Sequence, residues 1–108
     1  MTTHKTGTIA VIFTSHRMPD DGVDYGKAAA AMDALAATQP GYCGIDSARD
    51  AGGFGITVSY WTDEAAATAW RDHPEHAVIR DAGRKSWYRD YSLHVARVER
   101  SYDWNRQN

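Results

Sequence analysis

The sequence predicts an α+β domain whose elements follow one another in the order β-α-β-β-α(α)-β. Three features indicate this order: an apolar β-branched run near the N-terminus, an Ala-rich segment with helical spacing, and a Gly-containing turn between two strand-like runs. The order matches the split βαβ pattern of a ferredoxin-like sheet, which we expect to carry its helices on one face. All 108 residues then form one domain, 1–108, with a core at about residues 8–102.

Residues 8–14 form the first strand in this interpretation. They are almost continuously apolar and β-branched, which is typical of a strand buried on both faces. A turn-forming loop at residues 15–22 leads to a helix over residues 24–38, where Ala dominates and larger side chains recur every three or four positions. Pro40 and Gly41 then end that helix.

Two further runs, residues 42–49 and 54–62, flank the turn at residues 50–53 and predict a β-hairpin. The glycines of this turn are not a nucleotide-binding loop, because no helix follows them. Side chains of the second run alternate between two faces, neither of them wholly polar. One face carries Phe54, Ile56, Val58 and Tyr60, and the other carries Thr57, Ser59 and Trp61.

Two consecutive helices and a final strand complete the pattern. Thr62 or Asp63 can cap the first helix, which ends before Pro74. Proline suits the first position of a helix, so we expect the second one to start there and to reach about Gly83. Residues 91–102 alternate again and predict a long last strand.

Composition and charge argue against several classes of function. Lys and Arg number 12 against 14 for Asp and Glu, a net charge of -2 that provides no unmatched basic face for nucleic acid. Cys43 is the only cysteine, so no intramolecular disulfide can form and we expect a cytoplasmic location. No run is long and apolar enough for a membrane span or a secretory signal, and we expect neither membrane insertion nor export.

The strands are apolar on both sides, whereas the predicted helices cover only one face of the sheet. The other face therefore needs a cover that the chain itself does not contain. A second copy, packed sheet to sheet in a twofold homodimer, is the economical solution.

Aromatic and titratable residues gather between residues 61 and 88, a stretch that holds three of the four Trp, two His and several Arg. Such a group is typical of a binding site. The segments that carry it resemble the antibiotic biosynthesis monooxygenase family, and the resemblance extends over nearly the whole chain except residues 15–22. Its motifs are GITVSYW at 55–61, AWR at 69–71, HPEH at 73–76, GR at 83–84, WY at 87–88, Tyr91, and VARVERSY at 95–102.

The resemblance implies a dimeric α+β barrel with a pocket between the helices and the sheet of each subunit. Some family enzymes oxidise polycyclic phenols or anthrones with O2 and no cofactor, and others break down haem or quinols. The resemblance thus implies a cofactor-independent monooxygenase for an aromatic, polyketide-like or quinol-like substrate. Because O2 readily takes an electron only from a carbanion or phenolate, the pocket must bind a flat ring, exclude water and stabilise that anion.

His76 and Arg80 are the catalytic candidates that follow from this requirement. A neutral His76 can take the proton of the substrate. Arg80 lies one helical turn later on the same face, where its fixed charge can hold the resulting anion. The candidate substrate-binding walls are Tyr60, Trp61, Trp70, Trp87 and Tyr88.

Each of these residues also has a purely structural interpretation. Trp70 stands among small alanines and can be a core anchor, and Trp87 and Tyr88 can pack at an interface. His76 can fill a helix end. Its H-x-x-H spacing with His73 lacks a third ligand, so no metal site is predicted.

The alternative function is a non-catalytic dimer that binds a small molecule or haem, or that serves only for dimerisation. The haem-degrading branch of the family pairs a Trp, to which Trp70 corresponds, with an iron-ligating His about three turns later, where this chain has Arg80. That branch also has an Asn on the first strand, where this chain reads VIFT at residues 11–14. Both departures argue against haem ligation in the usual manner, and no cofactor is predicted.

Overall fold

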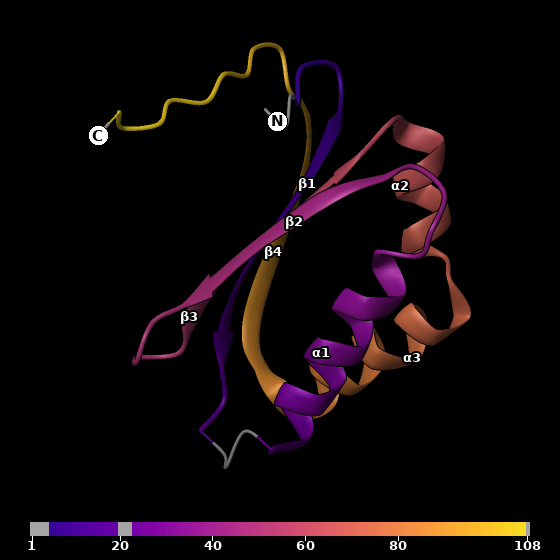
Figure 1. The fold of residues 1–108 in the computed structure, drawn as a ribbon. Coiled ribbons are helices and arrows are strands. Elements are labelled where there is room, and N and C mark those ends of the chain that lie inside the picture. The colour runs from indigo at the N-terminus through magenta and orange to yellow at the C-terminus, as the bar shows by residue number, and fades with distance from the viewer. Residues whose placement is uncertain (1–4, 20–22, 108) are drawn as a thin grey trace.

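The computed structural model describes residues 5–19 and 23–107, and in it a four-stranded antiparallel sheet carries helices on one face (Figure 1). The strand order is β2-β3-β1-β4. Along the chain the elements are β1 (Ile9–Arg17), α1 (Val23–Ala36), β2 (Tyr42–Arg49), β3 (Phe54–Trp61), α2 (Glu64–Arg71), α3 (Pro74–Ala82), a π-helical turn η1 (Gly83–Trp87) and β4 (Tyr88–Arg97). The predicted α+β class with its split βαβ order is confirmed.

Local caps explain where the second and third helices begin. The Asp63 side chain, one of the two predicted caps, accepts a hydrogen bond from the backbone N–H of Ala66 at 2.8 Å and caps α2. Pro74 prevents α2 and α3 from forming one continuous helix. The His73 ring caps α3 by accepting a hydrogen bond from the backbone N–H of Glu75 at 3.2 Å. The break between α2 and α3 therefore follows directly from local sequence.

Two strands, β1 and β4, depart most from their predicted bounds. β1 continues to Arg17 through residues expected to begin a loop, because β3 and β4 provide hydrogen-bonding partners on both sides; residues 20–22 of that loop lie outside the described chain. β4 begins three residues earlier than expected and ends at Arg97, whose partner Ile9 is the first residue of β1. Beyond it the C-terminal segment leaves the sheet (Figure 1).

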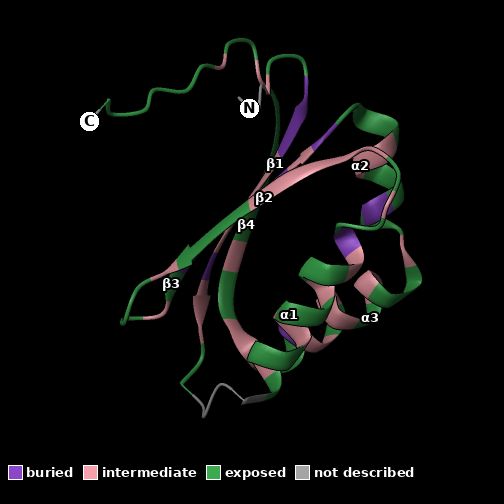
Figure 2. Cartoon of the chain, in the orientation of Figure 1, coloured by how far each residue is buried: buried purple, intermediate pink, exposed green. Residues whose placement is uncertain are grey.

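The apolar core is small and sits at the end of the sheet nearest α2. Trp61 is fully buried there and packs with Ala36 and Trp70, while the indole N–H of Trp61 donates to Ser59 Oγ at 3.0 Å. Figure 2 shows few buried residues elsewhere between the helices and the sheet. Packing at one end thus leaves the rest of the helix-facing side of the sheet open.

Among the described residues, no helix lies over the opposite face of the sheet (Figure 1). Strand register places one set of alternating side chains on it: Ala10, Ile12, Phe54, Ile56, Val58 and Tyr60. Phe54 and Ile56 are 37% and 42% exposed there. Among the helices of the described chain, none combines the length and apolar character that crossing a lipid bilayer requires.

Candidate functional site

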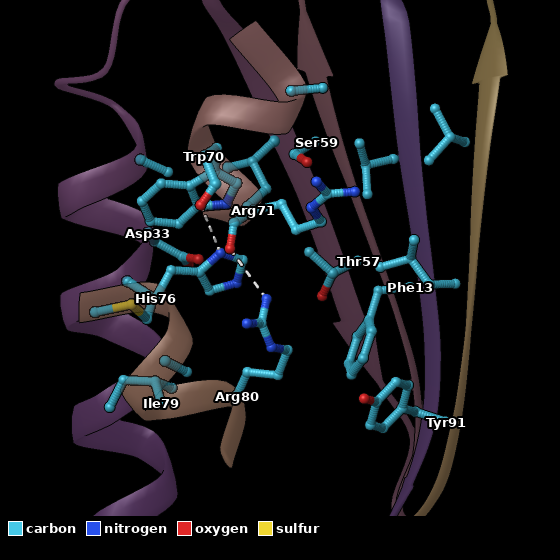
Figure 3. A pocket seen from close by; sticks show the side chains of 18 of the residues that line it. Phe13, Asp33, Thr57, Ser59, Trp70, Arg71, His76, Ile79, Arg80 and Tyr91 are labelled. Atoms are coloured by element: carbon cyan, nitrogen blue, oxygen red, sulfur yellow. Dashed lines mark hydrogen bonds between the residues drawn. The ribbon is translucent and has the colours of Figure 1, made fainter. Parts of the chain in front are cut away.

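A cavity of about 700 Å³ lies between the helices and the sheet, a volume typical of small-molecule pockets. Figure 3 shows His76 and Arg80 on its helix side, facing the strands that carry Phe13 and Thr57. Its apolar lining comes mainly from Val11, Phe13, Met32, Ile79, Leu93 and Val95. Leu93 and Val95 remain 51% and 56% exposed, so the cavity is open along β4.

His76 of α3 is held between a ring and a backbone carbonyl. Its imidazole stacks on Trp70 with centroids 4.4 Å apart and planes 14° apart. Its Nδ1 lies 3.0 Å from the carbonyl oxygen of Trp70. A carbonyl can only accept, so Nδ1 carries the proton and Nε2 keeps its lone pair.

The surroundings of His76 keep the ring neutral. Burial lowers its pKa below the ordinary value of 6.5, and the positive charge of Arg80 acts in the same direction, whereas the hydrogen bond to the Trp70 carbonyl acts in the opposite one. At neutral pH the ring is therefore an uncharged base with one fixed tautomer.

Arg80 lies one turn after His76 and lines the same cavity. Its Nη1 donates a hydrogen bond of 3.0 Å to the carbonyl oxygen of Arg71, at the C-terminal end of α2. The carbonyls of Trp70 and Arg71 thus hold the two side chains, and a neutral base stands beside a permanent cation (Figure 3). Such a pair can remove a proton and stabilise the anion that remains.

The five predicted aromatic walls divide between the cavity and other environments. Trp70, Trp87 and Tyr88 line the cavity. Trp61 does not, because it is fully buried and Trp70 packs against it at a centroid distance of 6.0 Å. Tyr60 does not either, because strand alternation turns it to the opposite face, under the ammonium group of Lys5.

A second polar group, which sequence reasoning missed, surrounds Tyr25. Tyr25 and Tyr88 both line the cavity, and the Tyr88 hydroxyl donates to the Tyr25 oxygen at 3.2 Å. Arg49 Nη2 donates to the same oxygen at 3.2 Å and to Ser15 Oγ at 2.8 Å. Burial and the contact with Tyr25 raise the pKa of Tyr88, which stays a neutral phenol.

No pattern in the sequence links these residues, since they come from four separate elements. Asp33 of α1 is another missed residue of the cavity wall, and partial burial raises the pKa of its carboxyl group. Over residues 5–19 and 23–107, no three His, Cys, Asp or Glu side chains are grouped as metal ligands.

Comparison with known proteins identifies relatives. A family model described as antibiotic biosynthesis monooxygenase matches residues 8–82. The uncharacterized protein YqjZ of Bacillus subtilis is 47% identical over 91 residues, which cover 84% of this chain and 79% of YqjZ.

Solved structures of similar fold include those of SnoaB and Rv0793. A variant of SnoaB, a cofactor-independent oxygenase from Streptomyces nogalater, has a TM-score of 0.77 at 14% identity, over 89% of this chain and 97% of its own. Rv0793 from Mycobacterium tuberculosis has a TM-score of 0.73 at 20% identity, over 82% of this chain and 92% of its own. At these identities the likeness concerns the fold alone.

Proposed function

Since the chain belongs to the antibiotic biosynthesis monooxygenase family, we propose that its cavity oxidises an electron-rich aromatic, polyketide-like or quinol-like molecule with O2 and without a cofactor. The observation that carries the proposal is His76, a neutral imidazole of fixed tautomer at the wall of an apolar cavity of about 700 Å³. The aromatic binding surfaces in the proposal are Trp70, Trp87 and Tyr88, and Tyr60 and Trp61 are left out because they do not reach the cavity.

The proposed first step is proton removal from the substrate. Nε2 of His76 takes the proton, and the Trp70 carbonyl stabilises the resulting imidazolium through Nδ1–H. The charge of Arg80 stabilises the carbanion or phenolate left behind. A positioned base of this kind typically contributes about 10²- to 10⁴-fold in rate.

The oxidation balances without any further reductant. For an anthrone, the carbanion passes its electrons to O2 and a C–O bond forms, and the resulting peroxide anion takes the proton back from His76 to give a hydroperoxide. Loss of water then leaves a quinone, so that one oxygen atom enters the product and the other leaves as water. The substrate itself supplies all the electrons.

The proposed assembly is a homodimer in the cytoplasm. Its support is the uncovered apolar face of the sheet, where Phe54 and Ile56 are substantially exposed in the single chain. An exposed apolar surface of this kind is typical of an interface, and a twofold axis would bury it in both copies at once.

The test uses protein freed of metals with a chelator, an oxygen electrode, and a panel of anthrones and hydroquinones. Oxygen uptake above the no-protein rate is expected, and it should fall by about 10²-fold or more in His76→Gln. His94→Gln, which changes a histidine outside the cavity lining, serves as the matched control. Absence of uptake across the whole panel would argue strongly against an oxygenase.

Titration with hemin separates the alternative of a haem-binding protein. A shift of the Soret band that His76→Ala abolishes would favour haem binding. Unchanged hemin spectra, together with His76-dependent oxygen uptake, would support the oxygenase.

A further inference from the structure

The polar group around Tyr25 lies at the opposite end of the cavity from His76. Ala36, at the end of α1, packs with Trp70, on which His76 stacks. Tyr25 is in the first turn of the same helix. At 1.5 Å per residue, its backbone lies about 16 Å from that of Ala36 along the helix axis. The cavity therefore has a polar group toward each of two ends, and the walls between them are mainly apolar.

The hydroxyl group of Tyr25 is prepared to donate a hydrogen bond. Its oxygen accepts from Arg49 Nη2 and from the Tyr88 hydroxyl, each at 3.2 Å, and these two bonds use both lone pairs. Its own proton meets no acceptor within the described parts of the chain. Because the Tyr25 side chain lines the cavity, an oxygen atom of a bound molecule can accept that proton.

Two glycines make room for this group. A Cβ atom at Gly55 would overlap the guanidinium group of Arg49, so only glycine lets that side chain lie across β3. A Cβ atom at Gly83 would lie 2.8 Å from the ring of Tyr88. Gly83 is the first residue of the π-helical turn η1. Such turns are rare in proteins overall, and many of those known lie at functional sites.

We infer that Tyr25, supported by Tyr88 and Arg49, binds a carbonyl, hydroxyl or phenolate oxygen of the substrate at this second end of the cavity. The inference rests on the proposed function and narrows its substrate class to fused-ring aromatics with an oxygen substituent remote from the deprotonated position. Tyr25 is the binding group. Arg49 does not line the cavity and acts through Tyr25 as a positioning residue.

The test compares two ligands of the same ring frame, anthrone and 9,10-dihydroanthracene, which lacks the oxygen. Binding is measured without O2 by quenching of tryptophan fluorescence, since Trp70 and Trp87 line the cavity. Wild-type protein should bind anthrone about tenfold more tightly than the hydrocarbon. Tyr25→Phe should abolish this preference and leave the affinity for the hydrocarbon unchanged. Tyr102→Phe, which removes the hydroxyl of a residue 83% exposed in the C-terminal segment, should keep it.

The role of Arg49 is tested with Arg49→Met and with Gly55→Ala, which displaces the guanidinium group and keeps the arginine itself. Both should reduce the preference for anthrone without weakening the binding of the hydrocarbon. Arg49→Lys should keep part of the preference that Arg49→Met loses. Circular dichroism checks that each variant is folded. If the affinities for both ligands fell equally, Arg49 would have a structural role only, and its assignment as a positioning residue would be overturned.

The outcomes separate this inference from the proposed oxygenase. If wild type shows no preference for anthrone, or if Tyr25→Phe retains it, the inference is overturned even when oxygen uptake depends on His76. If the preference is lost in Tyr25→Phe but no member of the panel is oxidised, Tyr25 binds the ligand oxygen as inferred and the oxygenase proposal fails.

Discussion

The imidazole of His76 lies flat on the indole of Trp70, with centroids 4.4 Å apart, and hydrogen-bonds through Nδ1 to the carbonyl of that same residue. Trp70 thus fixes the position of the ring and its tautomer at once. It also packs on the far side against buried Trp61. The position of the candidate base therefore depends on the apolar cluster of Trp61, Trp70 and Ala36.

Trp70→Ala should lower the free energy of unfolding by about 3–5 kcal/mol, because it removes a large buried aromatic from contact with Trp61 and Ala36. Urea denaturation followed by circular dichroism measures the change. A loss below about 1 kcal/mol would show that the surrounding helices close over the vacated space and that Trp70 is not an anchor.

Stability should depend on pH through His76. Its pKa in the folded chain is below 6.5, so between these two values the unfolded chain binds the proton more readily. The contribution of His76 is then fully present above pH 6.5 and is lost as the pH falls through the folded pKa. Wild type should lose more stability than His76→Gln between pH 7.5 and pH 5 in thermal melts, and parallel profiles would contradict the burial of a neutral ring.

Oxidation activity should also fall at low pH, because it requires the same neutral imidazole. If His76 is the base, kcat/KM for any oxidised substrate falls as the pH drops below the pKa of the free enzyme's imidazole, and this midpoint lies under 6.5. Arg80→Met removes one of the charges that lower this pKa, so its midpoint should move upward. A profile with the same midpoint in Arg80→Met would argue against the electrostatic contact.

Two glycines in helical segments should respond to alanine with opposite signs. Gly26 of α1 has open space around it, and Gly26→Ala should stabilise the protein by about 0.5–1 kcal/mol through helix propensity. Gly83→Ala gains the same propensity but forces apart the ring of Tyr88, which Phe13 and Tyr25 confine. Because overpacking costs about 1–3 kcal/mol, we expect a net loss of about 1 kcal/mol by urea denaturation. Stabilisation by both substitutions would contradict the tight fit of Tyr88.

The uncovered face of the sheet should mediate dimerisation. Ile56→Lys places a charge on this face, and burying it in an interface without a partner is costly. Light scattering after size exclusion should give a dimeric mass for wild type and a monomeric mass for the variant. Ser86→Lys, an exposed change in the π-helical turn, should remain dimeric. A monomeric wild type would refute the proposed assembly.

The sequence by itself determined the order of elements and the ends of several helices, because these depend on neighbours along the chain. Alanine content, the Asp63 cap and Pro74 at a helix start act within one turn, and the structure has α2 and α3 where these signals place them. The same local information could not end β4 correctly, since a strand stops where its neighbour stops.

Only the tertiary structure decided which aromatics share a cavity. Tyr60 and Trp61 are adjacent in sequence, yet strand alternation sends one to the opposite face, while the other fills the core that the helices close. Tyr25, Arg49 and Tyr88 stand far apart in the sequence, and only the folding of α1 against the sheet brings their polar atoms within hydrogen-bonding distance. Contacts between distant segments depend on how whole elements pack, and no local pattern of residues encodes that.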